Sequence, residues 1–259
     1  MVRLAVMAMG TRFELVARGD DPARLTAAGE AALERVEETH RWLTRFEGSS
    51  LLAHLQRVAP RPVVVDGPTV TLFAEARTIS EASGGAFAPV ISGDWSQVTI
   101  DPERQELALD HPGVGFDFGA IAKGHAVDLA VGVLREHHVP AAFVHGGTSS
   151  GSGYGHPGWP IALGPEADAP VVSLDGTGFA VSDTHQWRGD HRAPHLVDPA
   201  AGQPVAVPRR IVVVGPTARA ADGWATAVAV LGARPARMPS GYLTWVKAGE
   251  TPWRVMTDQ

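Results

Sequence analysis

Apolar residues along the chain follow strand spacing in some segments and helical spacing in others. The alternating run over residues 4–17 is typical of an edge-forming strand, interrupted by Met9-Gly10-Thr11. Asp20-Asp21-Pro22 then predicts a helix start, with an acidic cap and a proline in the first turn. An apolar stripe at helical intervals carries that predicted helix to about Leu43.

The rest of the chain mixes helices with short strands. Three more helices are predicted, over Thr69–Ala82, residues 124–137 and residues 222–231. Short strands are predicted at Pro62–Val65, Val98–Ile100, Glu106–Leu109, Ala141–Val144, Trp159–Leu163, 171–174, 179–182 and 211–214. No element is predicted in the glycine-rich segment 146–158. This mixture favours an α+β fold with a mainly antiparallel sheet over alternating βαβ units. With no linker and no fixed-period repeat, we expect one domain over residues 1–259.

Composition narrows the functional classes. The formal net charge of −6 and the lack of a basic stripe argue against a nucleic-acid surface. The chain has no cysteine, which excludes disulfides, thiolate catalysis and cysteine metal sites. No membrane span, signal peptide or lipobox cysteine is recognisable, so the chain as given is expected to be cytoplasmic.

The segment from Asp117 to Asp128 carries the strongest functional signal. It reads D-F-G-A-I-A-K-G-H-A-V-D, a small-residue loop that runs into a predicted helix. Small residues let the backbone approach a ligand, and the N–H groups that open a helix favour phosphate. Lys123 is notable because all but two of the 22 basic residues are Arg, and lysine is a common phosphate partner. The alternative is an ordinary strand-to-helix turn packed through Gly and Ala.

A carboxylate and a hydroxyl lie four residues apart near the end of the chain. A helix would place Asp222 and Thr226 on one face. Two such oxygens, with room for water and a substrate phosphate, suit Mg²⁺. The alternative is that Asp222 only caps the helix.

A third feature is the segment 194–205, P-H-L-V-D-P-A-A-G-Q-P-V. It places His195 and Asp198 on either side of a short predicted strand. The pair could provide a proton acceptor and a ligand contact. Equally, Asp198-Pro199 is compatible with ordinary turn chemistry.

Taken in order, these pieces resemble the ApbE family, the FAD:protein FMN transferases, and the resemblance covers roughly residues 7–232. One such motif is weak evidence for the family, whereas six motifs in register are strong evidence. The six parts are Met9-Gly10-Thr11, Thr44–Gln56, Ser83–Pro89, Asp117–Asp128, His195–Pro204 and Pro216–Thr226.

The resemblance implies an ApbE-type, T-fold-like α+β protein. It implies cleavage of FAD with Mg²⁺, release of AMP, and attachment of FMN to Thr or Ser of an acceptor flavoprotein. The metal positions of the family fall on Ala120, Asp222 and Thr226. Its flavin-contact positions fall on Met9, Phe46, Ala86, Phe87, Ala88, Asp117, Lys123 and Val197. Lys123 would neutralise developing charge, Phe46 or Phe87 could stack on a ring, and His195 is a candidate base for the acceptor hydroxyl.

The sequence also departs from the family pattern, mostly on the flavin and acceptor side. Phe46 replaces a Tyr, Gln56 an Asn and Ala88 an Asp. Residues 181–184 and 145–148 are loose versions of two further motifs. Two alternatives therefore stay open, an FAD pyrophosphatase that uses water as acceptor and a non-catalytic flavin-binding protein.

Overall fold

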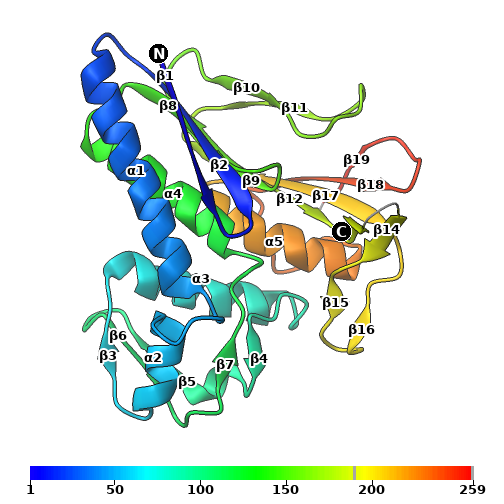
Figure 1. Cartoon of the computed structure of the whole chain (residues 1–259). Coiled ribbons are helices and arrows are strands. Elements are labelled where there is room, and N and C mark those ends of the chain that lie inside the picture. Colours follow the sequence, from blue (N-terminus) through cyan, green and yellow to red (C-terminus); the bar gives the residue numbers. More distant parts are fainter. Residues whose placement is uncertain (189–190, 258–259) are drawn as a thin grey trace.

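The computed structural model describes residues 1–188 and 191–257 and confirms the α+β prediction (Figure 1). Its main element is an eight-stranded sheet in which every described pairing is antiparallel. In spatial order the strands are β1 (Val2–Ala8), β2 (Thr11–Arg18), β8 (Ala141–Gly146), β9 (Ser150–Tyr154), β12 (Thr177–Asp183), β17 (Arg209–Gly215), β18 (Leu243–Ala248) and β19 (Arg254–Val255).

Three helices cover one face of this sheet, as Figure 1 shows. They are α1 (Pro22–Leu43), α4 (Ala122–Glu136) and α5 (Ala218–Leu231). The opposite face packs an aromatic cluster beneath the hairpin of β10 (Trp159–Ala162) and β11 (Val171–Leu174). The sheet is therefore buried on both faces along its centre.

A second layer lies at the far end of α1. It contains α2 (Leu51–Val58), α3 (Gly67–Ala82), a three-stranded sheet of β3 (Val63–Val64), β6 (Glu106–Leu109) and β5 (Val98–Asp101), and the pair β4 (Val90–Ser92) and β7 (Gly115–Phe116). A short 3₁₀ helix covers Trp95–Gln97. Helix α3 packs on α5, and one apolar cluster joins Phe73 and Ile79 of α3 to Trp224 and Val228 of α5. The two layers thus share a core.

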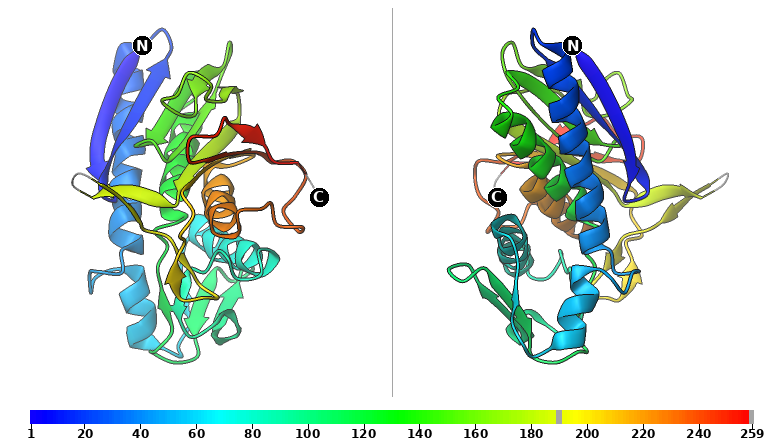
Figure 2. Two further views of the ribbon diagram at one scale, coloured as in Figure 1. Left: turned by 90° about the vertical axis from the view of Figure 1, so that its right-hand side faces the viewer. Right: turned by 60° about the vertical axis from the view of Figure 1, so that its left-hand side comes forward.

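Two small hairpins extend from the sheet. They are β13 (His185–Arg188) with β14 (His191–Pro194), and β15 (Val197–Asp198) with β16 (Gln203–Pro204). Figure 2 shows both hairpins projecting away from the sheet, and α1 running alongside the sheet down to the second layer.

Helix α1 begins and ends where the sequence predicts. The Asp21 side chain accepts a hydrogen bond from the Arg24 N–H, Pro22 occupies the first turn, and the helix ends at Leu43. Its apolar stripe, which includes Leu25 and Val36, is buried.

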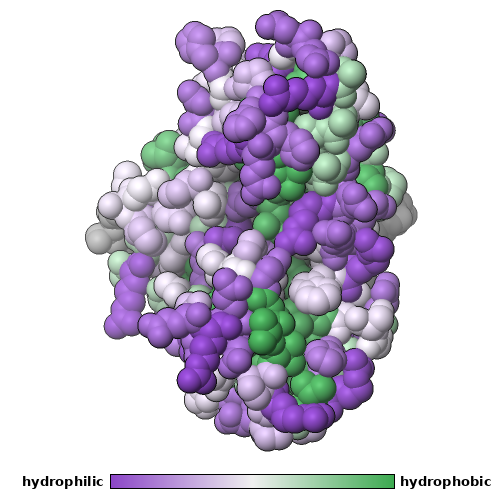
Figure 3. Space-filling model, turned by 90° about the vertical axis from the view of Figure 1, so that its left-hand side faces the viewer, coloured by the Kyte–Doolittle hydropathy of each residue, from purple (hydrophilic) through white to green (hydrophobic). Residues whose placement is uncertain are grey.

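Hydrophilic side chains predominate on the face of the molecule that carries α1, and apolar ones reach the surface in the lower half of the view (Figure 3). Among the helices that the structure describes, none combines the length and the apolar character needed to cross a membrane.

Two sequence predictions need correction. Residues 4–17 form a hairpin of two strands, not one interrupted strand, because Met9 and Gly10 both take positive φ values (50° and 70°) and reverse the chain. The glycine-rich segment contains the buried strand β9. A Cβ at Gly151 would meet the Phe179 ring at 2.6 Å, so this strand needs glycine for packing and not for a loop.

Candidate active site

The first turn of α4 is joined to the middle of α5 by an unusual hydrogen bond. The Gly124 N–H donates to Asp222 Oδ2 at 3.0 Å. In a regular helix this N–H would go to the carbonyl four residues earlier, that of Ala120. No hydrogen bond to the Ala120 carbonyl is found among the described residues. The arrangement therefore leaves a backbone oxygen free beside a buried carboxylate.

Close contact between α4 and α5 makes this bond possible. A Cβ added at Gly124 would lie 2.3 Å from the Ala218 carbonyl oxygen and 2.8 Å from the Arg219 Cα. Any side chain there would push the helices apart. A second link holds them in register, because the Asp128 carboxylate accepts hydrogen bonds from the N–H groups of Ala218 and Arg219, both at 2.9 Å. The central loop is thus fixed against α5 at two levels.

Asp222 is an acidic group in an enclosed place. Its side chain is buried, and burial raises the pKa of its carboxyl. The positive charge of Lys123 and the Gly124 N–H act in the opposite direction and favour the carboxylate. The Lys123 ammonium donates to the Gly119 carbonyl at 3.0 Å, which holds it over the loop. Burial of a carboxylate is costly unless positive charge compensates it, so a cation bound next to Asp222 would be stabilised.

The possibility that Asp222 only caps α5 is wrong. The N-cap of α5 is Thr217, whose side chain accepts from the Ala220 N–H, and Asp222 lies inside the helix. Thr226 follows one turn later, and its hydroxyl lies 3.4 Å from the Ser182 hydroxyl on β12. The helix does bring Asp222 and Thr226 onto the face that meets the sheet.

These residues fit a hard divalent cation. The Ala120 carbonyl lacks its helical partner, one Asp222 oxygen is engaged by Gly124, and Thr226 adds a hydroxyl. All three are oxygen donors, the type that Mg²⁺ prefers. No cluster of three or more His, Asp or Glu side chains able to hold a metal is found among the described residues. The predicted site therefore depends on a backbone carbonyl and a hydroxyl.

A cavity of about 370 Å³ opens beside the central loop. Four predicted flavin-contact residues line it: Met9, Phe46, Asp117 and Lys123. They come from the β1–β2 turn, the loop after α1, and the segment from the end of β7 to the start of α4, so three distant segments meet there. The volume is within the range of small-molecule sites. Phe46 is 81% exposed, which leaves its ring free to move onto a ligand.

Arg45 is a cavity residue that the sequence reasoning missed. Its Nε lies 3.1 Å from Asp117 Oδ2, and its guanidinium lies over the Phe46 ring, 4.5 Å from the centroid. The pair joins the loop after α1 to the central loop across the cavity. A basic residue inside the matched segment T-R-F was the available signal.

The predicted flavin-contact residues Ala86, Phe87 and Ala88 are not among the described residues that line the cavity, and the next residue, Pro89, links this segment to the central loop. The Asp117 N–H donates to the Pro89 carbonyl at 2.8 Å, and β4, which follows directly, pairs with β7, which precedes Asp117. Ala86 is buried, Ala88 is half-buried, and the Phe87 ring is 1% exposed in the core. Between the two rings considered for stacking, the structure leaves Phe46 available.

His195 and Val197 lie apart from the cavity. Neither is among the described residues that line it. The His195 N–H donates to the Thr184 carbonyl at 3.1 Å, and Val197 is exposed on β15. Asp198 lies in β15 and its carboxylate accepts from the Ala200 N–H at 2.9 Å, which is the turn chemistry considered as the alternative for this residue. The role of His195 stays a prediction, directed at an acceptor that enters from this hairpin.

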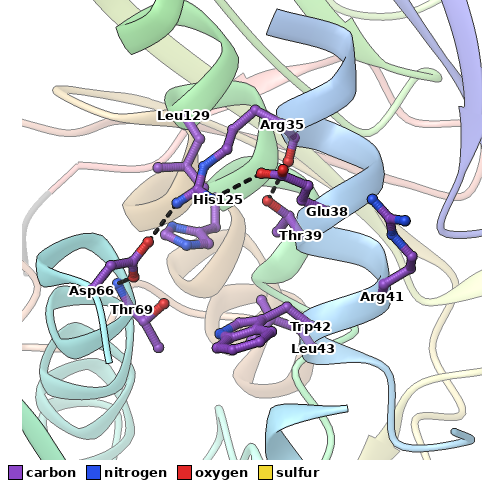
Figure 4. Close-up of a pocket in the computed structure, with 10 residues that line it drawn as sticks. All are labelled: Arg35, Glu38, Thr39, Arg41, Trp42, Leu43, Asp66, Thr69, His125 and Leu129. Atoms are coloured by element: carbon purple, nitrogen blue, oxygen red, sulfur yellow. Dashed lines mark hydrogen bonds and ion pairs between the residues drawn. The ribbon is translucent and has the colours of Figure 1, made fainter. Parts of the chain in front are cut away.

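A second cavity, of about 420 Å³, lies between α1, α3 and α4 (Figure 4). None of the predicted site residues lines it. Arg35 is held there by Glu38 at 3.1 Å and by Asp66 at 2.5 Å, so these three charges are paired with one another. His125 of α4 faces it and is almost completely buried. Leu43 contributes to the walls of both cavities.

Comparison with solved structures defines the class of fold. The ApbE protein of Thermotoga maritima superposes with a TM-score of 0.80 at 19% identity, covering 98% of this chain and 96% of that one. The apo form of the Pseudomonas stutzeri flavinyl transferase ApbE gives 0.79 at 21% identity, covering 98% and 93%. The architecture is therefore the ApbE fold.

Sequence comparison defines the family. The model of the ApbE family matches residues 9–93 and 90–238, so the chain belongs to the ApbE family. An FAD:protein FMN transferase of Klebsiella pneumoniae (strain 342) is 26% identical, over 88% of this chain and 78% of that protein. One from Treponema pallidum (strain Nichols) is 27% identical, over 81% and 73%.

Proposed function

We propose that this protein is an Mg²⁺-dependent FAD:protein FMN transferase. It would cleave the FAD pyrophosphate, release AMP, and attach FMN through a phosphoester to Thr or Ser of an acceptor flavoprotein. Membership of the ApbE family and similarity to transferases of that name over most of the chain support the activity. The observation that carries the site is the Gly124–Asp222 hydrogen bond, which leaves the Ala120 carbonyl without its helical partner in the same loop that brings Lys123 to the cavity.

The proposed role of each site residue follows from its position. Met9 and Phe46 offer apolar surface for the flavin ring, and Lys123 places a positive charge where the pyrophosphate would enter. Ala120, Asp222 and Thr226 would hold Mg²⁺. The bound ion supplies neutralisation of the pyrophosphate charge that develops during transfer.

In the transfer step, the acceptor hydroxyl oxygen forms a bond to the phosphorus of the FMN half. The bond from that phosphorus to the oxygen of AMP breaks, and AMP leaves with the bridging oxygen. His195 is the candidate base that would take the proton of the acceptor hydroxyl, which requires the acceptor to enter from the side of the hairpin, because His195 does not line the cavity. Lys123 would stabilise the charge on the leaving phosphate.

The test is incubation with FAD, Mg²⁺ and a threonine-bearing acceptor peptide, followed by mass measurement of the peptide and the nucleotides. Transfer predicts a peptide heavier by one FMN and an equal amount of AMP. Free FMN with an unmodified peptide would instead support a pyrophosphatase. Intact FAD after hours with metal would support a binding protein and refute the proposal.

Two variants separate the metal from the phosphate contact. Asp222→Asn keeps the size and can still accept from Gly124, but it loses the charge, so we expect turnover to fall at least about 100-fold with the fold intact. Lys123→Arg keeps the charge but places a planar guanidinium group in a small-residue loop. We therefore expect a lower rate of FAD turnover. Normal AMP release by Asp222→Asn at low millimolar Mg²⁺ would remove Asp222 from the metal site.

A further inference from the structure

Ser150 is a buried polar side chain that no feature of the sequence singled out. It is the first residue of β9 and has no exposed surface. Its hydroxyl oxygen has no hydrogen-bond partner among the described residues. Buried hydroxyls are normally satisfied, and an exception points to a water or ion that completes the site. The environment of Ser150 shows which of these is expected.

The register of the sheet places Ser150 opposite the metal-site helix. Ser150 pairs with Ala180 of β12, and Ala180 packs in the cluster that contains α5. Ser182 lies two residues further along β12, hence on the same face, and its hydroxyl meets Thr226 of α5. Gly151 points to the other face, where a Cβ would meet the Phe179 ring. Ser150 is therefore on the face that α5 covers.

The Ser150 hydroxyl lies beside the Asp222 carboxylate. It is one of the groups that act on this carboxylate, together with Lys123 and the Gly124 N–H, although it does not reach hydrogen-bond geometry. Gly124 holds Oδ2 of Asp222 from the α4 side. A hydroxyl on the sheet side is placed to fix the rotation of the same carboxylate, because two restraints from different elements define its plane.

We propose that Ser150 is a positioning residue of the divalent-cation site, which orients the Asp222 carboxylate toward the ion and hydrogen-bonds an oxygen bound there. The inference rests on the proposed function, because it extends the metal site of Ala120, Asp222 and Thr226. With the ion bound, the Ser150 hydroxyl would gain a partner that it lacks among the described residues.

This role predicts effects of opposite direction in the two states. Ser150→Ala removes an unsatisfied group from the metal-free protein, so its melting temperature should stay the same or rise. The same change should weaken the metal site by about three- to tenfold, within the range seen for groups that orient metal ligands. A merely structural serine predicts the reverse, a lower melting temperature with unchanged metal affinity.

Ser152 provides the matched control. It lies two residues along β9 on the same face, and its hydroxyl donates to the Thr177 carbonyl at 3.0 Å. Ser152→Ala should lower the melting temperature of the metal-free protein, because it leaves that carbonyl without its donor. Its metal affinity should stay within twofold of the parent protein.

The experiment titrates Mn²⁺ alone into the full chain and follows free Mn²⁺ by electron paramagnetic resonance. Weaker binding by Ser150→Ala but not by Ser152→Ala, with no loss of metal-free stability, supports the inference. Equal Mn²⁺ affinity in Ser150→Ala and the parent protein overturns the inference alone. If the parent protein binds no Mn²⁺, the metal site of the proposed function falls and the inference with it.

Discussion

His125 makes the stability of this protein sensitive to mild acid. The side chain is 2% exposed on α4, and its Nδ1 lies 3.4 Å from Nη1 of Arg219. Burial first, and the charge of Arg219 second, lower the pKa of His125 from 6.5 to about 3; Arg35 acts in the same direction and Asp66 in the opposite one. In the unfolded chain the imidazole regains its ordinary pKa. Below that pKa the unfolded state therefore binds a proton at His125 that the folded state does not bind.

The sign and size of the effect follow from these values. The pKa is lower in the folded state, so the stabilising contribution is present above pH 6.5 and is lost as the pH falls toward 3. Between pH 7 and pH 5 the unfolded state gains most of one proton, which corresponds to about 2 kcal/mol of unfolding free energy. This figure depends little on the folded pKa as long as that value stays below 5.

The perturbation is His125→Tyr, which replaces the imidazole by a ring that carries no charge between pH 5 and pH 7, at a position that borders the 420 Å³ cavity. We expect the variant to lose about 2 kcal/mol less than the parent protein between pH 7 and pH 5. Urea unfolding at pH 7, 6 and 5 in metal-free buffer measures the difference. Asp128, whose pKa burial raises to about 6, contributes with opposite sign in both proteins and cancels.

The matched control is His137→Gln, which removes an exposed histidine at the C-terminal end of the same helix. It should leave the pH dependence unchanged. Parallel curves of unfolding free energy against pH for His125→Tyr and the parent protein would refute the reasoning, since they would mean that His125 accepts its proton equally well in both states.

Three further predictions test packing, capping and the cavity. Gly124→Ala should lower the free energy of unfolding by about 2–3 kcal/mol in urea denaturation, because its Cβ would lie 2.3 Å from the Ala218 oxygen. Gly132→Ala in the same helix meets nothing within 4 Å and should instead raise that free energy by about 0.5–1 kcal/mol; equal effects would contradict the packing argument. Thr217→Ala should cost about 1 kcal/mol through loss of the α5 cap, measured by the same unfolding assay. Phe46→Ala should leave the melting temperature unchanged, since the ring is exposed, and weaken FAD about tenfold in a fluorescence titration.

The sequence by itself determined the elements with strong local signals. The bounds of α1 follow from Asp21, Pro22 and an apolar stripe, and all of these act within a few residues of each other. The helical spacing of Asp222 and Thr226 likewise predicts one face without knowledge of the fold. The order of the six motifs was enough to recognise the family, because residue identities in register carry that information directly.

Only the tertiary structure decided how these pieces meet. The Gly124 N–H goes to a carboxylate 98 positions away, which explains why the Ala120 carbonyl lacks its helical partner. The Ala218 oxygen, 2.3 Å from where a Cβ would lie, explains why this position is glycine. A role for Ser150 could be inferred only from the register of β9, which places this side chain on the face of the sheet that α5 covers. A serine in a glycine-rich segment has no local sequence signal. Local periodicity is set by the backbone of one element, whereas the donors of a site come from elements that the fold brings together.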